Sequence, residues 1–111
     1  MNQGDWMGRN FFTGGTIPST KLFHFFNDHL RIMDTWYIKG TEYSKTLDAW
    51  LEELTRKRKV ALEVFQKNGY SQPHVEFQKW RMFYLMCSES FKYNNGGEWM
   101  VAYYLLQKTK F

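Results

Sequence analysis

Apolar side chains recur at helical spacing over two long stretches of the chain, and β-forming residues fill two shorter ones. Over 43–67 the apolar residues fall three, four and seven positions apart, which predicts one long helix. A second apolar stripe predicts a helix over 74–91. Runs rich in β-branched and aromatic residues predict strands over 30–39 and 98–109. The pattern therefore indicates an α/β chain.

Glycine, proline, serine and asparagine residues predict the loops and helix ends near the amino end and between the two long helices. Gly14-Gly15 and Pro18 predict that residues 1–20 form a loop. The apolar residues of 21–29 predict a short amphipathic helix, with Ser19 as its N-cap. Asn68-Gly69 predicts a helix stop, because glycine adopts the left-handed cap conformation without penalty.

The final predicted strand is apolar on both of its faces. Trp99, Val101 and Tyr103 alternate with Met100 and Ala102, so neither face of the strand is polar. Such a strand belongs in the interior of a sheet, with its two faces covered. Two strands cannot supply that cover, and isolated hairpins are marginally stable. We therefore expect further sheet beside this one.

Composition narrows the classes of function. The chain has 111 residues, enough for one domain, and 20% of them are aromatic. That content suits an aromatic core, a pocket for a lipid chain or flat amine, or a docking surface. The net charge of +4 is too small to indicate nucleic acid, and we expect none as a partner. The basic run Arg56 to Lys59 is either a solvated helix face or a contact for anionic phospholipid headgroups.

Cysteine and histidine usage argues against a metal centre. Cys87 is the single cysteine, which excludes an internal disulfide and a cysteine-based zinc site. The histidines His24, His29 and His74 lack metal-ligand spacing. The first residues lack a signal-peptide pattern, and no stretch of about 20 apolar residues occurs. We expect a cytoplasmic protein, either soluble or peripheral to a membrane.

Three short motifs occur in order along the chain. They are Phe11-Phe12-Thr13-Gly14-Gly15-Thr16-Ile17-Pro18-Ser19, Gly40-Thr41-Glu42-Tyr43-Ser44-Lys45-Thr46-Leu47-Asp48-Ala49-Trp50 and Phe91-Lys92-Tyr93-Asn94-Asn95-Gly96-Gly97-Glu98-Trp99. Together they resemble the carboxyl-terminal third of the cyclopropane-fatty-acyl-phospholipid synthases and the related coclaurine-type N-methyltransferases. The resemblance covers about residues 5–108.

The resemblance implies a partial class I methyltransferase fold, which is Rossmann-like. It would comprise the last two antiparallel strands and the substrate-cap helices, as a carboxyl-terminal segment of a methyltransferase domain over 1–111. The family's cofactor is S-adenosylmethionine, whose glycine-rich turn and acidic residue lie upstream of the matched motifs. Gly14-Gly15 does not have the spacing of that turn, so the cofactor-binding half is expected to be absent here. The family's acid–base glutamate and histidine also belong upstream.

The resemblance also implies roles for four residues. Tyr43 matches a tyrosine that helps hold a bicarbonate base in the cyclopropane synthases, where a cation formed by methyl transfer must lose a proton, and it is the predicted catalytic residue. Cys87 matches a cysteine near the same ion, although a lone cysteine is usually a small apolar residue. Trp80 and Phe83 match aromatic residues that line the amine pocket of the N-methyltransferases. These last three are the predicted substrate-binding residues.

The main hypothesis is a fragment of an S-adenosylmethionine-dependent methyltransferase of the cyclopropane synthase type, acting on unsaturated phospholipid acyl chains. One alternative is a fragment of a coclaurine-type amine N-methyltransferase, whose partner is a small amine. Another is a non-catalytic module that binds an anionic membrane surface or a sheet edge. On any of these readings the chain alone is expected to be inactive, as a short product or an incomplete gene model.

Overall fold

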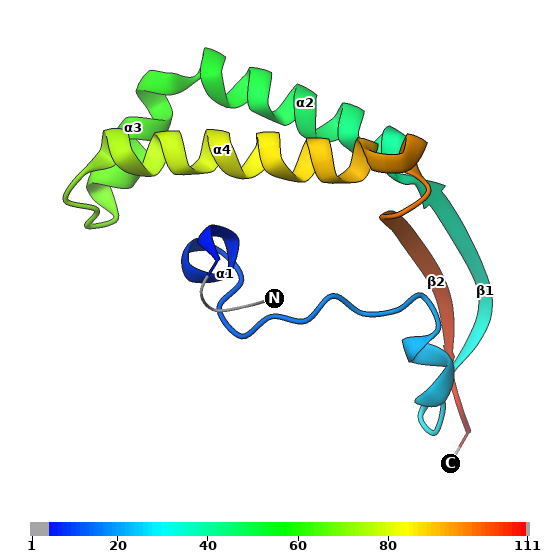
Figure 1. Ribbon diagram of the computed structural model, residues 1–111. Coiled ribbons are helices and arrows are strands. Elements are labelled where there is room, and N and C mark those ends of the chain that lie inside the picture. Colours follow the sequence, from blue (N-terminus) through cyan, green and yellow to red (C-terminus); the bar gives the residue numbers. More distant parts are fainter. Residues whose placement is uncertain (1–4, 111) are drawn as a thin grey trace. The chain divides into compact units, whose positions relative to one another are not determined.

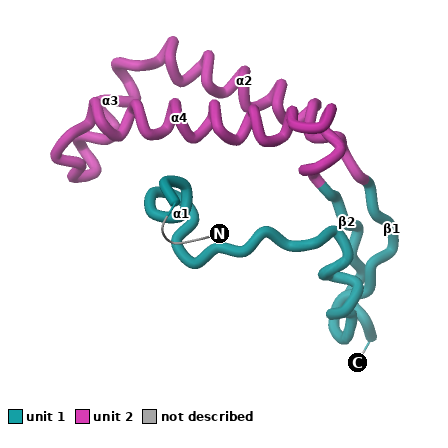
Figure 2. The backbone as a smooth tube through the Cα atoms, viewed as in Figure 1, with its two compact units in different colours: residues 1–36, 102–111 teal, residues 37–101 magenta. Residues whose placement is uncertain are grey.

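The computed structural model describes residues 5–110, which divide into two compact units (Figure 2). One unit comprises residues 1–36 and 102–111, and the other comprises residues 37–101. The elements in chain order (Figure 1) are α1 (Trp6–Asn10), the 3-10 helix η1 (Leu22–Phe25), β1 (Leu30–Lys39), α2 (Gly40–Arg56), α3 (Arg58–Lys67), α4 (Pro73–Lys92), the 3-10 turn η2 (Tyr93–Gly96) and β2 (Met100–Lys108).

The amino-terminal segment differs from its predicted form in two places. The predicted loop 1–20 contains α1, whose N-cap Asp5 accepts a hydrogen bond from the Gly8 amide at 2.5 Å. The predicted helix 21–29 is reduced to η1, and residues 26–29 form a non-helical bend before β1. Thr109 donates to the carbonyl oxygens of His29 and Asp28, through its amide and its hydroxyl respectively. These bonds tie the bend before β1 to the residue that follows β2.

The sheet of the described residues has two antiparallel strands, β1 and β2. β1 occupies the range of the predicted strand, and β2 is shorter than the predicted 98–109 by two residues at its start and one at its end. Both faces keep large apolar side chains between 40% and 55% exposed, namely Leu30, Met33, Trp36, Tyr37, Met100, Tyr103, Leu105 and Leu106. This exposure agrees with the expectation that further structure is needed to cover the strands.

The predicted single helix 43–67 is two helices in the structure. α2 begins three residues earlier, at Gly40, and the chain leaves helical geometry at Lys57 before α3. The break changes the direction of the chain, so that both α2 and α3 contact α4 (Figure 1). The apolar periodicity continues across the break because both helices pack on the same partner.

α3 ends in a Schellman motif at the predicted stop. Gly69 has a φ of +85°. Its amide donates to the Gln66 carbonyl at 3.3 Å, and the Tyr70 amide donates to the Phe65 carbonyl at 3.2 Å. The rings of Phe65 and Tyr70 meet edge to face at 5.6 Å, which is the apolar contact that accompanies this motif.

The core of the second unit lies between α2 and α4. Leu47 and Phe77 are 1% and 2% exposed, and each such burial contributes about 2 kcal/mol. Two hydroxyls, those of Ser44 and Ser88, are buried in the same interface. Within the described residues, no helix is long and apolar enough to cross a bilayer.

Candidate functional site

Tyr43 lies in the first turn of α2, and two glycines allow that turn to form where it does. A Cβ added at Gly40 would lie 2.2 Å from the Phe91 carbonyl oxygen and 2.3 Å from that of Trp99. A Cβ added at Gly96 would lie 2.6 Å from the Thr41 amide nitrogen. Only glycine therefore allows the end of α4 and the turn η2 to approach the start of α2 this closely.

The turn η2 is left-handed over three consecutive residues. Asn94 and Asn95 have φ values of 52° and 54°, and Gly96 has a φ of 77°. Asparagine and glycine are the residues that tolerate this conformation best, which accounts for the local sequence. The predicted turn is thus present, and its tight curvature returns the chain past α2 towards β2.

Tyr43 is surrounded by aromatic rings from both long helices. Its ring meets that of Phe91 edge to face at 4.7 Å and that of Trp50 at 6.1 Å. Burial is the main cause that raises the pKa of the Tyr43 phenol, and the neighbouring Cys87 and Tyr84 raise it further. The phenol therefore stays protonated at neutral pH, able to donate or accept a hydrogen bond.

A chain of ring contacts continues along α4. Trp80 meets Phe83 edge to face at 5.7 Å and Tyr84 at 6.1 Å, and Tyr84 lies 6.2 Å from Trp50 of α2. The predicted residues Trp80, Phe83 and Tyr43 thus belong to one set of rings, which we call the aromatic cluster. Its members are Tyr43, Trp50, Trp80, Phe83, Tyr84 and Phe91.

Cys87 lies beside this cluster and is not an activated thiol. The side chain is partly buried, and burial raises the pKa of its thiol. A raised pKa leaves little thiolate at neutral pH, which argues against a nucleophilic role. The position suits an apolar wall of a pocket.

Three members of the cluster were not predicted as site residues. Trp50 follows Tyr43 by seven residues, Phe91 follows Cys87 by four, and Tyr84 follows Trp80 by four. These spacings place each pair on one helix face, and they are the signal that could have identified all three.

A polar network, buried at its two serines, joins α2 to α4. The Ser44 and Ser88 hydroxyl oxygens are 2.8 Å apart, and Ser88 donates to Asp48 Oδ1 at 2.5 Å. Asp48 Oδ2 lies 3.3 Å from Lys92 Nζ. The Ser88 hydrogen bond is the main cause that lowers the pKa of the Asp48 carboxyl, and Lys92 adds to it against the effect of burial.

The basic run at the end of α2 is partly neutralised. Arg56 Nη2 and Lys57 Nζ lie 2.6 Å and 2.8 Å from Glu53 Oε1. Arg58 lies 5.5 Å from the Phe77 ring centroid, in a cation–π contact. This arrangement fits the solvated-face interpretation of the run.

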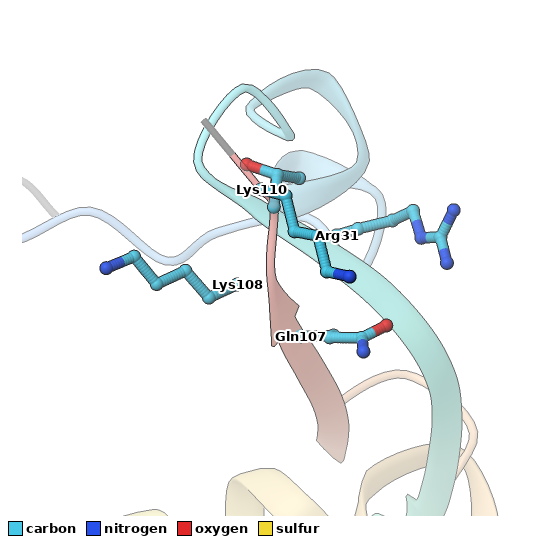
Figure 3. A pocket seen from close by; sticks show the side chains of 5 residues that line it. Arg31, Gln107, Lys108 and Lys110 are labelled. Carbon is cyan, nitrogen blue, oxygen red and sulfur yellow. The ribbon is translucent and has the colours of Figure 1, made fainter.

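A separate depression lies in the first unit (Figure 3). It has a volume of about 320 Å³ and is lined by Arg31, Gln107, Lys108, Thr109 and Lys110. Figure 3 shows the Arg31 and Lys108 side chains extending in opposite directions, so their charges do not converge on one point. None of the four predicted site residues lines it.

Neither a metal site nor a glycine-rich cofactor turn is found among the described residues. Over residues 5–110, no group of three or more histidine, cysteine, aspartate or glutamate side chains could hold a metal ion. Gly14-Gly15 lies between α1 and η1, and the Gly15 amide donates to the Phe12 carbonyl at 3.0 Å in a tight turn. Among the residues described from Asp5 onward, the element before this pair is the helix α1, so the pair does not fit the phosphate-binding turn of a nucleotide cofactor, which follows a strand.

Comparison with curated proteins finds plant N-methyltransferases. The chain is 32% identical to (S)-coclaurine N-methyltransferase of Thalictrum flavum subsp. glaucum, over 97% of this chain and 31% of that enzyme. It is 29% identical to (S)-tetrahydroprotoberberine N-methyltransferase of Eschscholzia californica, over 97% of this chain and 32% of that enzyme. A scan against protein-family models finds none that matches. The chain thus spans about a third of the length of these relatives.

A solved structure of one of these N-methyltransferases has a similar fold over the matched third. The crystal structure of coclaurine N-methyltransferase bound to N-methylheliamine and SAH matches with a TM-score of 0.78 and 32% identity. The match covers 98% of this chain and 33% of the other. The chain is therefore homologous to one third of the coclaurine-type N-methyltransferases, and over that third it has their class I methyltransferase fold.

Proposed function

We propose that this chain is the acceptor-side, carboxyl-terminal segment of an S-adenosylmethionine-dependent N-methyltransferase that acts on a small aromatic amine. The observation that carries the proposal is the 32% identity to (S)-coclaurine N-methyltransferase over 97% of the chain. It favours the amine alternative over the phospholipid hypothesis, because the relatives reported above are all amine N-methyltransferases. For the same reason, the predicted bicarbonate base and the predicted anionic membrane partner have no support from these relatives.

The aromatic cluster supplies the chemistry that an amine acceptor needs. Ring faces attract a cationic amine, and their apolar edges pack on its aromatic rings. Trp80 and Phe83 meet at 5.7 Å and lie on one face of α4, so they can form one wall of such a pocket. In this proposal Tyr43 hydrogen-bonds the amine or its ring substituent through its protonated phenol, whose pKa burial raises further above neutral pH.

The described residues do not fit S-adenosylmethionine, because neither glycine pair links the end of a strand to the start of a helix: Gly14-Gly15 lies between α1 and η1, and Gly96-Gly97 lies between α4 and β2. In this proposal, the cofactor site and the general base are supplied by the part of the domain that precedes this segment. The segment itself binds and orients the acceptor and excludes water from it. The 111-residue chain alone should show no S-adenosylmethionine binding by calorimetry, and micromolar binding would contradict this division of roles.

A chimera tests the substrate class directly. This chain would replace the matched third of Thalictrum flavum (S)-coclaurine N-methyltransferase, and labelled S-adenosylmethionine would be offered with coclaurine or with unsaturated phospholipid vesicles. We expect label in the amine and not in the lipid. Label in the lipid, or none in either from a folded chimera that binds the cofactor, would overturn the proposal.

Substitution within the chimera then tests the pocket. Trp80→Ala removes one ring of the wall and should raise the KM for coclaurine about tenfold, which is the cost of one lost aromatic contact of about 1.4 kcal/mol. Met82→Ala is the matched control, because Met82 is 49% exposed on the same helix and carries no aromatic ring. An equal KM for the two variants would remove Trp80 from the pocket.

A further inference from the structure

The polar network between α2 and α4 has a defined direction. A carboxylate only accepts hydrogen bonds, so the single Ser88 hydroxyl hydrogen goes to Asp48 Oδ1, at 2.5 Å. The Ser44 hydroxyl must then donate to Ser88 Oγ, at 2.8 Å. Asp48 in turn faces Lys92 Nζ at 3.3 Å. The bonds run in one sense from the buried interface to the surface, an arrangement in which each bond strengthens the next.

The two serines of this network are buried among apolar side chains of the same interface. Ser44 and Ser88 are each 1% exposed, and Leu47 and Phe77 fill the same interface. Apolar burial is non-directional, and cores that keep only their apolar volume lose a unique arrangement before they lose stability. A shift by one turn would leave two buried hydroxyls without partners, which is costly. A buried polar pair of this kind selects one register.

We propose that Ser44, Ser88 and Asp48 fix the register of α2 against α4 and thereby position Tyr43 in the acceptor pocket. Tyr43 directly precedes Ser44 in the chain, and Cys87 directly precedes Ser88. Tyr84 lies one helical turn before Ser88. A single register therefore decides which side chains of α4 face the Tyr43 phenol.

The pocket assignment rests on the proposed function, whereas the register assignment rests on the geometry alone. The test therefore uses no substrate and no cofactor. Its failure would leave the amine proposal standing, and failure of the amine proposal would leave the register intact. Ser44, Ser88 and Asp48 are positioning residues, since they act through Tyr43.

The experiment compares four variants of the full 111-residue chain. Ser88→Ala and Asp48→Ala remove the donor and the acceptor of the central bond. Asp48→Asn keeps an acceptor oxygen without the charge. Ser90→Ala is the matched control, because Ser90 is on the same helix but exposed, and its hydroxyl bonds only to the Met86 carbonyl of that helix. Carbon-13 tyrosine spectra, with Tyr43→Phe for assignment, report the Tyr43 pKa, and alkylation reports the access of reagent to Cys87.

We expect Ser88→Ala and Asp48→Ala to move the Tyr43 pKa towards the ordinary tyrosine value and to speed Cys87 alkylation several-fold. Both effects follow from water entering a loosened interface. Asp48→Asn and Ser90→Ala should leave both readouts unchanged. If Ser88→Ala loses its helical circular dichroism, Asp48→Ala carries the test, because the Asp48 side chain is 48% exposed. A lower melting temperature with an unchanged Tyr43 pKa and Cys87 rate would show a merely stabilising role and overturn the proposal.

Discussion

At the scale of single residues, the start of α2 depends on the absence of a side chain at Gly40. Two carbonyl oxygens, from Phe91 and Trp99, occupy the space that a Cβ would need. Both belong to the backbone, so neither can swing aside as a flexible side chain would. This contact fixes the first turn of the helix that carries Tyr43.

Gly40→Ala is therefore expected to destabilise the second unit by about 3 kcal/mol, the upper range for forced overpacking. Gly15→Ala is the control, because its Cβ would meet Phe12 at an ordinary 3.4 Å and should cost little. Urea unfolding followed by circular dichroism measures both. Equal midpoints for the two variants would mean that the backbone at Gly40 yields more easily than this geometry implies.

Glu53 gives a second prediction at the residue scale. Its hydrogen bonds with Arg56 and then Lys57 lower the pKa of the carboxyl from 4.5 to about 2. Because the folded-state pKa is the lower one, the ion pairs stabilise the fold above pH 4.5, and that contribution is lost as the pH falls towards 2.

Carbon-13 NMR titration should place the Glu53 pKa near 2 at low salt. The pairs are exposed, so molar salt should move this pKa back towards 4.5 by screening. Arg56→Gln should raise it even at low salt, whereas Arg31→Gln, a change of the same type in β1, should not. A Glu53 pKa that stays near 4.5 at low salt would contradict the observed pairing.

At the scale of elements, the sequence predicts an element boundary correctly where one residue type decides the backbone conformation. Asn68-Gly69 predicts the end of α3, and the Schellman bonds lie at that position. The break at Lys57 was missed, because apolar periodicity is the same for one helix as for two that pack on a common partner. The shortening of helix 21–29 was missed because it depends on Thr109, which is distant in the sequence.

At Gly69, the free-energy cost of a left-handed backbone conformation can be measured without any steric clash. A Cβ there would meet nothing within 4 Å, so the φ of +85° is the only source of strain. Gly69→Ala should lower the free energy of unfolding by about 1 kcal/mol. Gly69→Asn should cost less than half of that, because asparagine tolerates this conformation. Thermal unfolding measures both, and an equal loss for both would place the strain elsewhere.

For the candidate site, short motifs predict Tyr43, Trp80, Phe83 and Cys87. The structure places the first three in one aromatic cluster, and the roles of all four stay predictions. The pairing of Ser44 with Ser88 could not be predicted, because it depends on the register between two helices. A serine on an apolar stripe carries no sequence signal for its partner.

At the scale of the whole molecule, the exposed faces of β1 and β2 are the main feature to explain. A soluble domain covers such faces, yet Tyr37 and Tyr103 are each 55% exposed here. The match covers only about a third of the relatives, and on the proposed function the other two thirds of a methyltransferase domain would cover these faces. Alone, the chain should therefore bind hydrophobic dyes and self-associate.

Adding the unmatched two thirds of Thalictrum flavum (S)-coclaurine N-methyltransferase as a separate chain should suppress both effects and give a one-to-one complex by light scattering. Tyr103→Lys places a charge on the face of β2 and should weaken this complex at least tenfold, because burying an unpaired charge costs well over 1.4 kcal/mol. Gln66→Lys, which adds the same charge on the exposed surface of α3, should not. If both variants bind as the unaltered chain does, the faces of the sheet are not where the rest of the domain docks, and their apolar side chains need another explanation.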